Sequence, residues 1–243
     1  FCATGASGFF RNLTSSEIWG QVLFWKAYIK EHKINGHAYR QAGKISNVVY
    51  MGMGEPFNNL ENVFESVRVL TDPQMLGIGQ RSVSISTCGV VPGIERFAQE
   101  FPQVNLAISL HAPSDELRNQ LMPVNQAYNL KALAQGLKDY FKKANRKVFI
   151  EYILLDGVND SLENANDLVS YLAGIGNRQL LHVNLIVFNQ VQGSKLNPSS
   201  RNQAERFKNF LIKNKFNATI RKSLGQDIEG ACGQLAGQKP ATR

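Results

Sequence analysis

Short apolar runs alternate with longer amphipathic stretches along most of the chain. Five runs are rich in β-branched residues, at 45–51, 81–86, 104–110, 147–155 and 180–188. Runs of this kind are typical of strands buried on both faces of a sheet. Helical patterns lie between and after them, at 59–70, 93–100, 130–143, 162–172 and 201–213. This alternation predicts an α/β fold with a parallel sheet and right-handed crossovers, as an open sheet or a barrel.

A further helical pattern, at residues 15–32, precedes the first apolar run. Side chains suited to helix caps occur at three places, namely Thr14, Ser15 and Glu17, then Ser114 and Asp115, then Asp160 and Ser161. Their oxygens can accept hydrogen bonds from the unpaired amides of a first helical turn. Since a strand would normally precede the leading helix, we expect one domain, 1–243, that lacks its first strand and carries a C-terminal extension.

Glycine and polar residues gather where the predicted strands end. They are Gly52, Gly54, Glu55 and Pro56 after the first strand, Ser86, Thr87 and Gly89 after the second, Ser109, His111 and Pro113 after the third, Asp156 and Asn159 after the fourth, and Asn189 after the fifth. Ligands of parallel α/β proteins bind at this edge, because the strand-to-helix loops converge there. Taken singly, each residue fits a loop cap or a structural hydrogen bond equally well. The agreement of five strands predicts a ligand site.

The stretch "MGMGEP" after the first strand is the sharpest of these signals. Its glycines allow positive φ or a close approach of the backbone to a ligand, and Pro56 fixes the turn. Glu55 suits a ligand ammonium group. The stretch has neither the P-loop lysine nor the full dinucleotide glycine spacing, which argues against nucleoside triphosphate chemistry. A tight turn with an exposed glutamate is the plain alternative.

Composition narrows the class of protein. The formal charge of +8 and the pI near 9.4 favour a polyanionic partner. Three cysteines in 243 residues, Cys2, Cys88 and Cys232, cannot build a disulfide framework or a self-contained zinc site. No apolar run is long enough to span a bilayer and no secretory signal is visible, so the expected location is the cytoplasm.

Two of the cysteines lie in contrasting surroundings. Cys88 follows an apolar strand and is expected to be a small packed residue. Cys232 lies between Ala231 and Gly233, in a stretch preceded by charged residues. This setting predicts an accessible, chemically usable thiol.

These features together resemble one family over nearly the whole chain, the radical S-adenosylmethionine (radical SAM) RNA methyltransferases of the RlmN and Cfr type. The residues that carry the resemblance are "FCATG", "GFFRNLT", "NVVYMGMGEP", "STCGVVPGI", "AISLHAP", "EYILLDGVND", "VNLI" with Asn189, and "DIEGACGQLAG". The resemblance implies a partial (β/α)6-type radical SAM barrel, truncated before its first strand and without the family's N-terminal RNA-binding domain.

The resemblance also implies two cofactors, a 4Fe-4S cluster and S-adenosylmethionine. Cys2 matches the last of the three cluster cysteines, and a cluster with three thiolate ligands leaves one iron open to the second cofactor. Gly54 and Glu55 match residues that hold the methionine end. The rest of the cofactor pocket is matched by Ser86, Ser109, Leu110, His111 and Asn189. Because only one cluster cysteine is present, we expect the 243-residue chain alone to hold no cluster and to methylate no RNA.

The implied reaction is methylation of carbon 2 of an adenosine in 23S rRNA. Members of the family can also modify an adenosine beside the anticodon of tRNA, and whether rRNA is the only substrate stays open at this stage. Carbon 2 is electron-poor and does not attack the methyl group of S-adenosylmethionine. In the family, the cysteine matching Cys232 is therefore methylated first, and a 5'-deoxyadenosyl radical then activates that methyl group. A flavodoxin-like donor supplies the electron. We expect a monomer without a membrane partner.

Three alternatives remain open at this stage. One is the carbon-8 specificity of Cfr, although the motifs favour carbon 2. Another is a radical SAM enzyme that acts on a small molecule, which would not need Cys232. The third is a non-catalytic RNA-binding fragment, which the positive charge and the missing first strand would fit.

Overall fold

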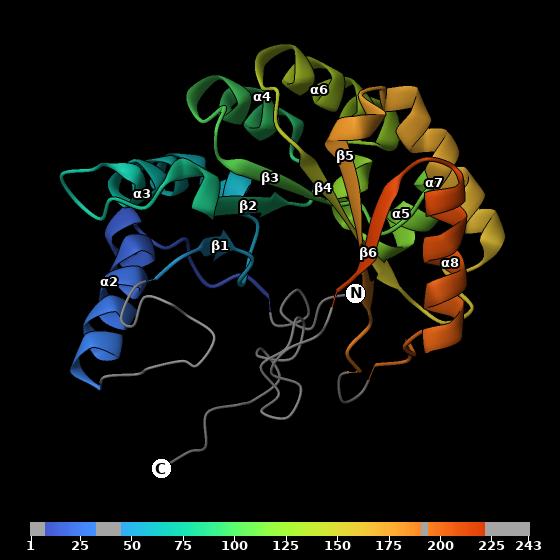
Figure 1. Ribbon diagram of the computed structural model, residues 1–243, viewed down its shortest axis with the longest axis horizontal. Helices are drawn as coiled ribbons and strands as arrows, with labels where there is room; N and C mark the ends of the chain where they lie inside the picture. The colour runs from blue at the N-terminus through green and yellow to red at the C-terminus, as the bar shows by residue number, and fades with distance from the viewer. Residues whose placement is uncertain (1–7, 33–44, 191–193, 222–243) are drawn as a thin grey trace.

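Six parallel strands form a single curved sheet whose spatial order follows the chain (Figure 1). The computed structural model describes residues 8–32, 45–190 and 194–221. Its strands are β1 (Val48–Tyr50), β2 (Val83–Thr87), β3 (Asn105–Ser109), β4 (Val148–Leu154), β5 (Leu181–Val187) and β6 (Asn217–Ile220). Every neighbouring pair is parallel, so all the C-terminal strand ends lie at one edge.

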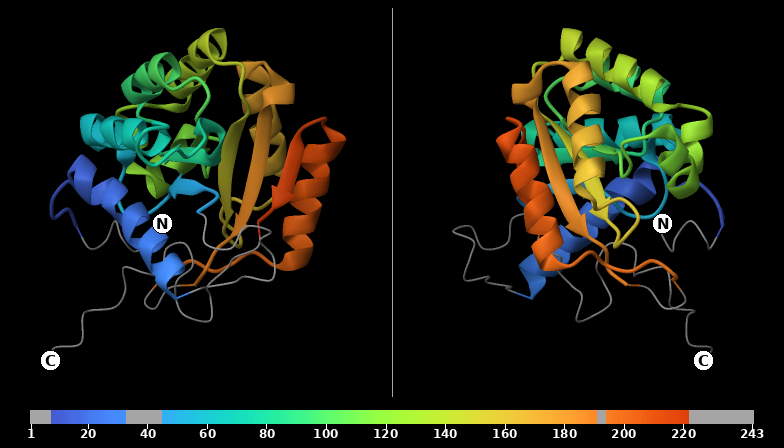
Figure 2. Two further views of the ribbon diagram at one scale, coloured as in Figure 1. Left: turned by 60° about the vertical axis from the view of Figure 1, so that its left-hand side comes forward. Right: turned by 90° about the vertical axis from the view of Figure 1, so that its right-hand side faces the viewer.

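Helices line the outer, convex side of this sheet (Figures 1 and 2). They are α2 (Ser15–Glu31), α3 (Leu60–Thr71), α4 (Val91–Glu100), α5 (Asp115–Leu121), α6 (Leu130–Lys143), α7 (Leu162–Ile175) and α8 (Arg201–Lys213). Short 3-10 helices occur at η1 (Pro56–Asn59), η2 (Gln80–Ser82), η3 (Pro123–Gln126) and η4 (Arg178–Leu180). The predicted caps at Thr14, Ser114 and Ser161 each accept a backbone N–H of the first turn.

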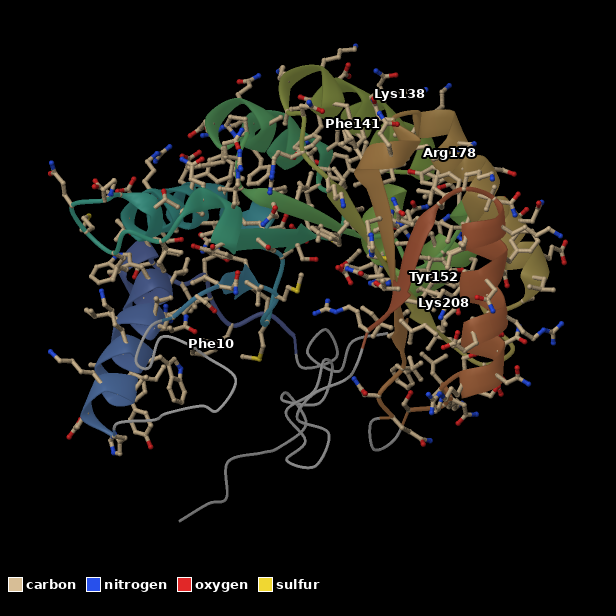
Figure 3. The ribbon with its side chains drawn as sticks, in the orientation of Figure 1. Phe10, Lys138, Phe141, Tyr152, Arg178 and Lys208 are labelled. Atoms are coloured by element: carbon tan, nitrogen blue, oxygen red, sulfur yellow. The ribbon has the colours of Figure 1, made fainter. Side chains whose placement is uncertain are left out.

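The core lies between the sheet and the outer helices. Along β2 the outward side chains Val83 and Ile85 are buried, while Ser84 and Ser86 on the inner face are only half-buried. Farther along the sheet, Tyr152 of β4 packs on Phe207 of α8, with ring centroids 5.3 Å apart. Figure 3 labels Tyr152. Burial of this alternating apolar face is the main force that holds the helices to the sheet.

The inner face carries a belt of polar side chains instead. Ser86, Ser109, Glu151, Asn184 and Thr219 come one from each of the strands β2 to β6. Asn184 Nδ2 donates to Glu151 Oε1 at 2.9 Å, and Thr219 Oγ1 donates to Asn184 Oδ1 at 2.9 Å. Since the interior of a purely structural barrel is filled by apolar branched side chains, this belt indicates a surface that faces a polar ligand.

The predicted fold is confirmed, with differences in the elements. All five predicted strands form, but the first is shorter than residues 45–51. The helix start predicted at Ser114 and Asp115 is confirmed by α5, whose extent was not predicted, and β6 at the outer edge of the sheet was not predicted. Among the described residues, no helix is long and apolar enough to cross a membrane.

Candidate functional site

Glu55 ties the end of β1 to the end of β2. Its Oε1 accepts hydrogen bonds from the Thr87 hydroxyl at 2.7 Å and from the Phe57 backbone N–H at 3.0 Å. Its Oε2 accepts from the Cys88 backbone N–H at 2.7 Å. These donors use three of the roughly four acceptor positions of a carboxylate. The remaining capacity suits a cationic ligand group at the sheet edge.

The turn before Glu55 explains the glycine and proline of "MGMGEP". Gly54 has φ +91°, a region that favours glycine, and a Cβ atom there would meet nothing within 4 Å. Pro56 then opens η1, and Phe57 is buried against the core. The turn therefore leaves free space beside Gly54 while it holds Glu55 in one place.

Two serines lie side by side on the inner face. Ser86 Oγ is 3.4 Å from Ser109 Oγ, and both side chains are half-buried. Directly after Ser109, the N–H groups of Leu110 and His111 both donate to the Glu151 carbonyl, at 3.0 and 3.4 Å. The end of β3 is thus fastened to β4, and the paired hydroxyls remain beside the inner face.

His111 is buried in a left-handed conformation, with φ +59°. Its Nδ1 accepts from the Ile153 N–H at 3.1 Å, and its carbonyl accepts from Asn159 Nδ2 at 2.8 Å. Burial, followed by the positive charge of Arg118, lowers the pKa of the imidazole to about 3. The ring is therefore neutral at physiological pH.

The stability of the fold should fall in mild acid because of His111. An unfolded histidine binds a proton below its ordinary pKa of 6.5, whereas the folded ring stays neutral down to about pH 3. The stabilisation from neutral His111 is complete above pH 6.5 and is lost as the pH falls. The free energy of unfolding should drop by up to about 2 kcal/mol between pH 7 and pH 5. Urea titrations at both pH values should show that His111→Asn flattens this dependence, while His32→Asn on the exposed end of α2 retains it. An unchanged slope in His111→Asn would contradict the assignment.

Cys88 is packed, as predicted. It is half-buried against the core, and burial, followed by the charge of Glu55, raises the pKa of its thiol far above the usual range. A thiol of this kind is a poor metal ligand. Among the described residues, no group of three His, Cys, Asp or Glu side chains could hold a metal ion.

The structure brings six of the predicted site residues together in a first group and places a seventh, Asn189, after another strand. The ends of β1, β2 and β3 carry Gly54, Glu55, Ser86, Ser109, Leu110 and His111, and Asn189 is buried just after β5. Cys2 and Cys232 lie outside the described residues. Sequence reasoning missed Arg118 and Asn125, which are buried behind this edge. An arginine inside an amphipathic helix gives no sequence signal for such a position.

The model of the radical SAM superfamily matches residues 1–169, a span that contains β1, β2, β3 and every residue of the first group. The chain belongs to the radical SAM superfamily. Among curated proteins, it is 42% identical to a probable dual-specificity RNA methyltransferase RlmN of Clostridium novyi, and 44% identical to one of Thermoanaerobacter sp., over 97% of this chain in both cases. It is 40% identical to a ribosomal RNA large subunit methyltransferase Cfr of Clostridium botulinum, again over 97% of the chain. The chain spans 64% of the length of each of these relatives.

Solved structures agree with this membership. A radical SAM methyltransferase from Sphaerobacter thermophilus superimposes with a TM-score of 0.88 at 41% identity, covering 97% of this chain and 66% of that one. A domain of a pyruvate-formate lyase-activating enzyme from Bacteroides vulgatus has a TM-score of 0.55 at 17% identity, covers 73% of this chain, and shares the fold alone. In the fold shared with these structures, Glu55 and the two serines lie at the C-terminal ends of parallel strands.

Proposed function

We propose that this chain is the core of a radical S-adenosylmethionine RNA methyltransferase that methylates carbon 2 of an adenosine in 23S rRNA. The observation that carries the proposal is the similarity to RlmN proteins, at 42% and 44% identity over almost the whole chain. The polar edge of the sheet supports it. An adenosine beside the anticodon of tRNA is proposed as a second substrate, in line with the dual specificity in the names of these relatives.

The residues of the edge fit S-adenosylmethionine. The space beside Gly54 and the remaining acceptor capacity of Glu55 suit an amino-acid end that carries an ammonium group. Ser86 and Ser109 offer hydroxyls to polar groups farther along the ligand, and Leu110, His111 and Asn189 complete the proposed pocket. When bound, S-adenosylmethionine would supply the methyl group and, on one-electron reduction with release of methionine, the radical chemistry of the reaction. Glu55 orients the ligand, and neutral His111 keeps its loop free of a charge that would compete with the ligand sulfonium.

Among the described residues, no group of three His, Cys, Asp or Glu side chains could hold an iron-sulfur cluster. Cys2 remains the proposed ligand from this chain. Cys232 is proposed to carry the methyl group before its transfer to carbon 2, because an electron-poor ring carbon does not attack S-adenosylmethionine directly. The proposed setting is a cytoplasmic monomer served by a flavodoxin-like electron donor.

The test uses a bacterial strain that lacks its own carbon-2 methyltransferase. The complete gene that encodes this chain is expressed there, and its 23S rRNA and tRNA are digested and analysed by mass spectrometry. We expect 2-methyladenosine in both RNAs, and one extra methyl group on the Cys232 peptide of the purified protein. Cys232→Ala should remove the RNA product, whereas Ser170→Ala on the exposed side of α7 should not.

Other outcomes would favour the alternatives. If 8-methyladenosine appeared alone, the carbon-8 specificity of Cfr would replace the proposal. If 2-methyladenosine persisted in Cys232→Ala, the methylated-cysteine route would be wrong. If neither product formed although the protein bound RNA, a non-catalytic RNA-binding role would be favoured.

A further inference from the structure

We propose that Arg118 is a positioning residue that aligns Glu55 for the amino-acid end of the cofactor, acting through the backbone of Cys88. This inference rests on the proposed function in one respect, namely that Glu55 faces the ligand ammonium. It concerns a residue in α5 whose guanidinium hydrogen-bonds the backbone that follows β2 and β3. Neither the sequence pattern nor the resemblance assigns a role to Arg118.

Arg118 is fully buried, with a relative exposure of 0%. All five of its hydrogen-bond acceptors are neutral. They are the backbone carbonyls of Cys88 at 2.6 Å, Leu110 at 3.1 Å, Ser109 at 3.4 Å and Tyr128 at 3.4 Å, and Asn125 Oδ1 at 2.8 Å. One guanidinium thus joins the turn after β2 to the turn after β3.

Cys88 connects this guanidinium to the carboxylate of Glu55. Its N–H donates to Glu55 Oε2 at 2.7 Å, and its carbonyl accepts from Arg118 Nη2 at 2.6 Å. The carboxylate of Glu55 therefore holds the N–H of Cys88, and the guanidinium of Arg118 holds its carbonyl. Hydrogen bonds to charged groups are stronger and more strictly oriented than neutral ones. The position of the Cys88 N–H, and with it that of Glu55, depends on Arg118.

The charge of Arg118 needs an explanation beyond packing. Burial lowers the pKa of its guanidinium, so holding this charge inside the protein has an energetic cost that neutral acceptors offset only in part. Two carboxylates are linked to the guanidinium through one intervening residue each. Asp115 accepts from Asn125 at 2.9 Å, and Glu55 is reached through Cys88. The guanidinium and the Glu55 carboxylate are thus joined through the backbone of Cys88.

The same guanidinium reaches the predicted cofactor residues Ser109 and Leu110 through their carbonyls. On the other side, the Leu110 N–H donates to the Glu151 carbonyl. The end of β3 is therefore held from both sides. Because Glu151 also holds the end of β3, loss of Arg118 should displace the Glu55 corner more than the paired serines.

The experiment measures binding of two probes that need no iron, by calorimetry on the 243-residue chain. S-adenosylhomocysteine carries the ammonium group that Glu55 is proposed to meet, and 5'-methylthioadenosine lacks the amino-acid end. We expect Arg118→Met to lower the affinity for S-adenosylhomocysteine at least about tenfold, which corresponds to the loss of one charge-assisted contact. The affinity for 5'-methylthioadenosine should change less than about threefold. Arg118→Lys keeps the charge but reaches fewer acceptors, so its loss should fall between Arg118→Met and the wild type.

A double-mutant cycle separates positioning from general support of the fold. If Arg118 acts through Glu55, Arg118→Met adds less than about a twofold loss to Glu55→Gln, because the group it aligns is already disabled. Leu168→Ala, in the buried face of α7, controls for lost stability and should leave the ratio of the two affinities unchanged.

Several results would overturn the proposal. These are equal losses for both probes, multiplicative effects of the two substitutions, or wild-type affinity in Arg118→Lys. If Arg118→Met does not fold, the lysine variant and its cycle with Glu55→Gln decide. Failure of the wild-type chain to bind either probe would refute the cofactor assignment itself, and this inference with it. Binding of the wild type with equal losses in the variants would refute the role of Arg118 alone.

Discussion

Glu55→Gln should lower the affinity for S-adenosylhomocysteine by about 100-fold, while 5'-methylthioadenosine binds within about threefold of the wild type. The carboxylate is held by three donors from η1 and the end of β2, so its direction is fixed before any ligand arrives. Charge-assisted hydrogen bonds in such preorganised sites contribute about 3 kcal/mol, which is roughly two decades in affinity. Glutamine loses the charge and also turns an amide donor toward the Cys88 N–H or the Thr87 hydroxyl.

The matched control is Glu65→Gln, an exposed carboxylate on α3 that pairs with Arg68. It carries the same chemical change away from the sheet edge and should leave both affinities unaltered. A thermal melt of each variant separates binding from folding, because the three internal bonds of Glu55 also stabilise the chain. If Glu55→Gln bound both probes as the wild type does, Glu55 would be only a cap that joins β1 to β2.

The alternation of strands and helices could be predicted from the sequence because the strands are apolar on the face that packs against the helices. The ligand edge followed from parallel topology, which brings Glu55, Ser86 and Ser109 to one side. The edge strand β6 gave no such signal, because only Ala218 and Ile220 are half-buried in it while its other residues are exposed. Only the start of α5 was predicted, from its caps, because the helix is seven residues long and one of its two buried side chains is Arg118.

The support behind the site could not be predicted from the sequence. Arg118 and Asn125 are polar residues to which the sequence pattern assigned no role, and tertiary packing buries them. Asn159 was expected at the polar edge as a ligand candidate. The structure instead buries it completely and uses all of its side-chain polar atoms within the fold. Which polar residue meets a ligand and which supports it is decided by tertiary contacts that local pattern does not record.

Asn159→Ala should destabilise the chain by about 3 to 4 kcal/mol, a large part of the stability of an ordinary domain. Nδ2 of Asn159 donates to the His111 carbonyl at 2.8 Å and to the Ile153 carbonyl at 2.7 Å, and Oδ1 accepts from the Leu155 N–H at 2.8 Å. Alanine leaves these three buried backbone groups without that partner. Asn159→Asp should be worse still, because it turns a carboxylate oxygen toward two carbonyl oxygens.

Urea denaturation at pH 7, followed by circular dichroism, measures this loss from the shift in midpoint at constant slope. Asn166→Ala, in α7, makes the same chemical change on a side chain that faces solvent. It should change the free energy of unfolding by less than about 0.5 kcal/mol, which is the usual range for surface substitutions. A loss in Asn159→Ala no larger than this control would show that the ends of β3 and β4 do not depend on the amide. A full loss, with weaker S-adenosylhomocysteine binding in the surviving folded protein, would show that the bond to His111 also holds the ligand edge in place.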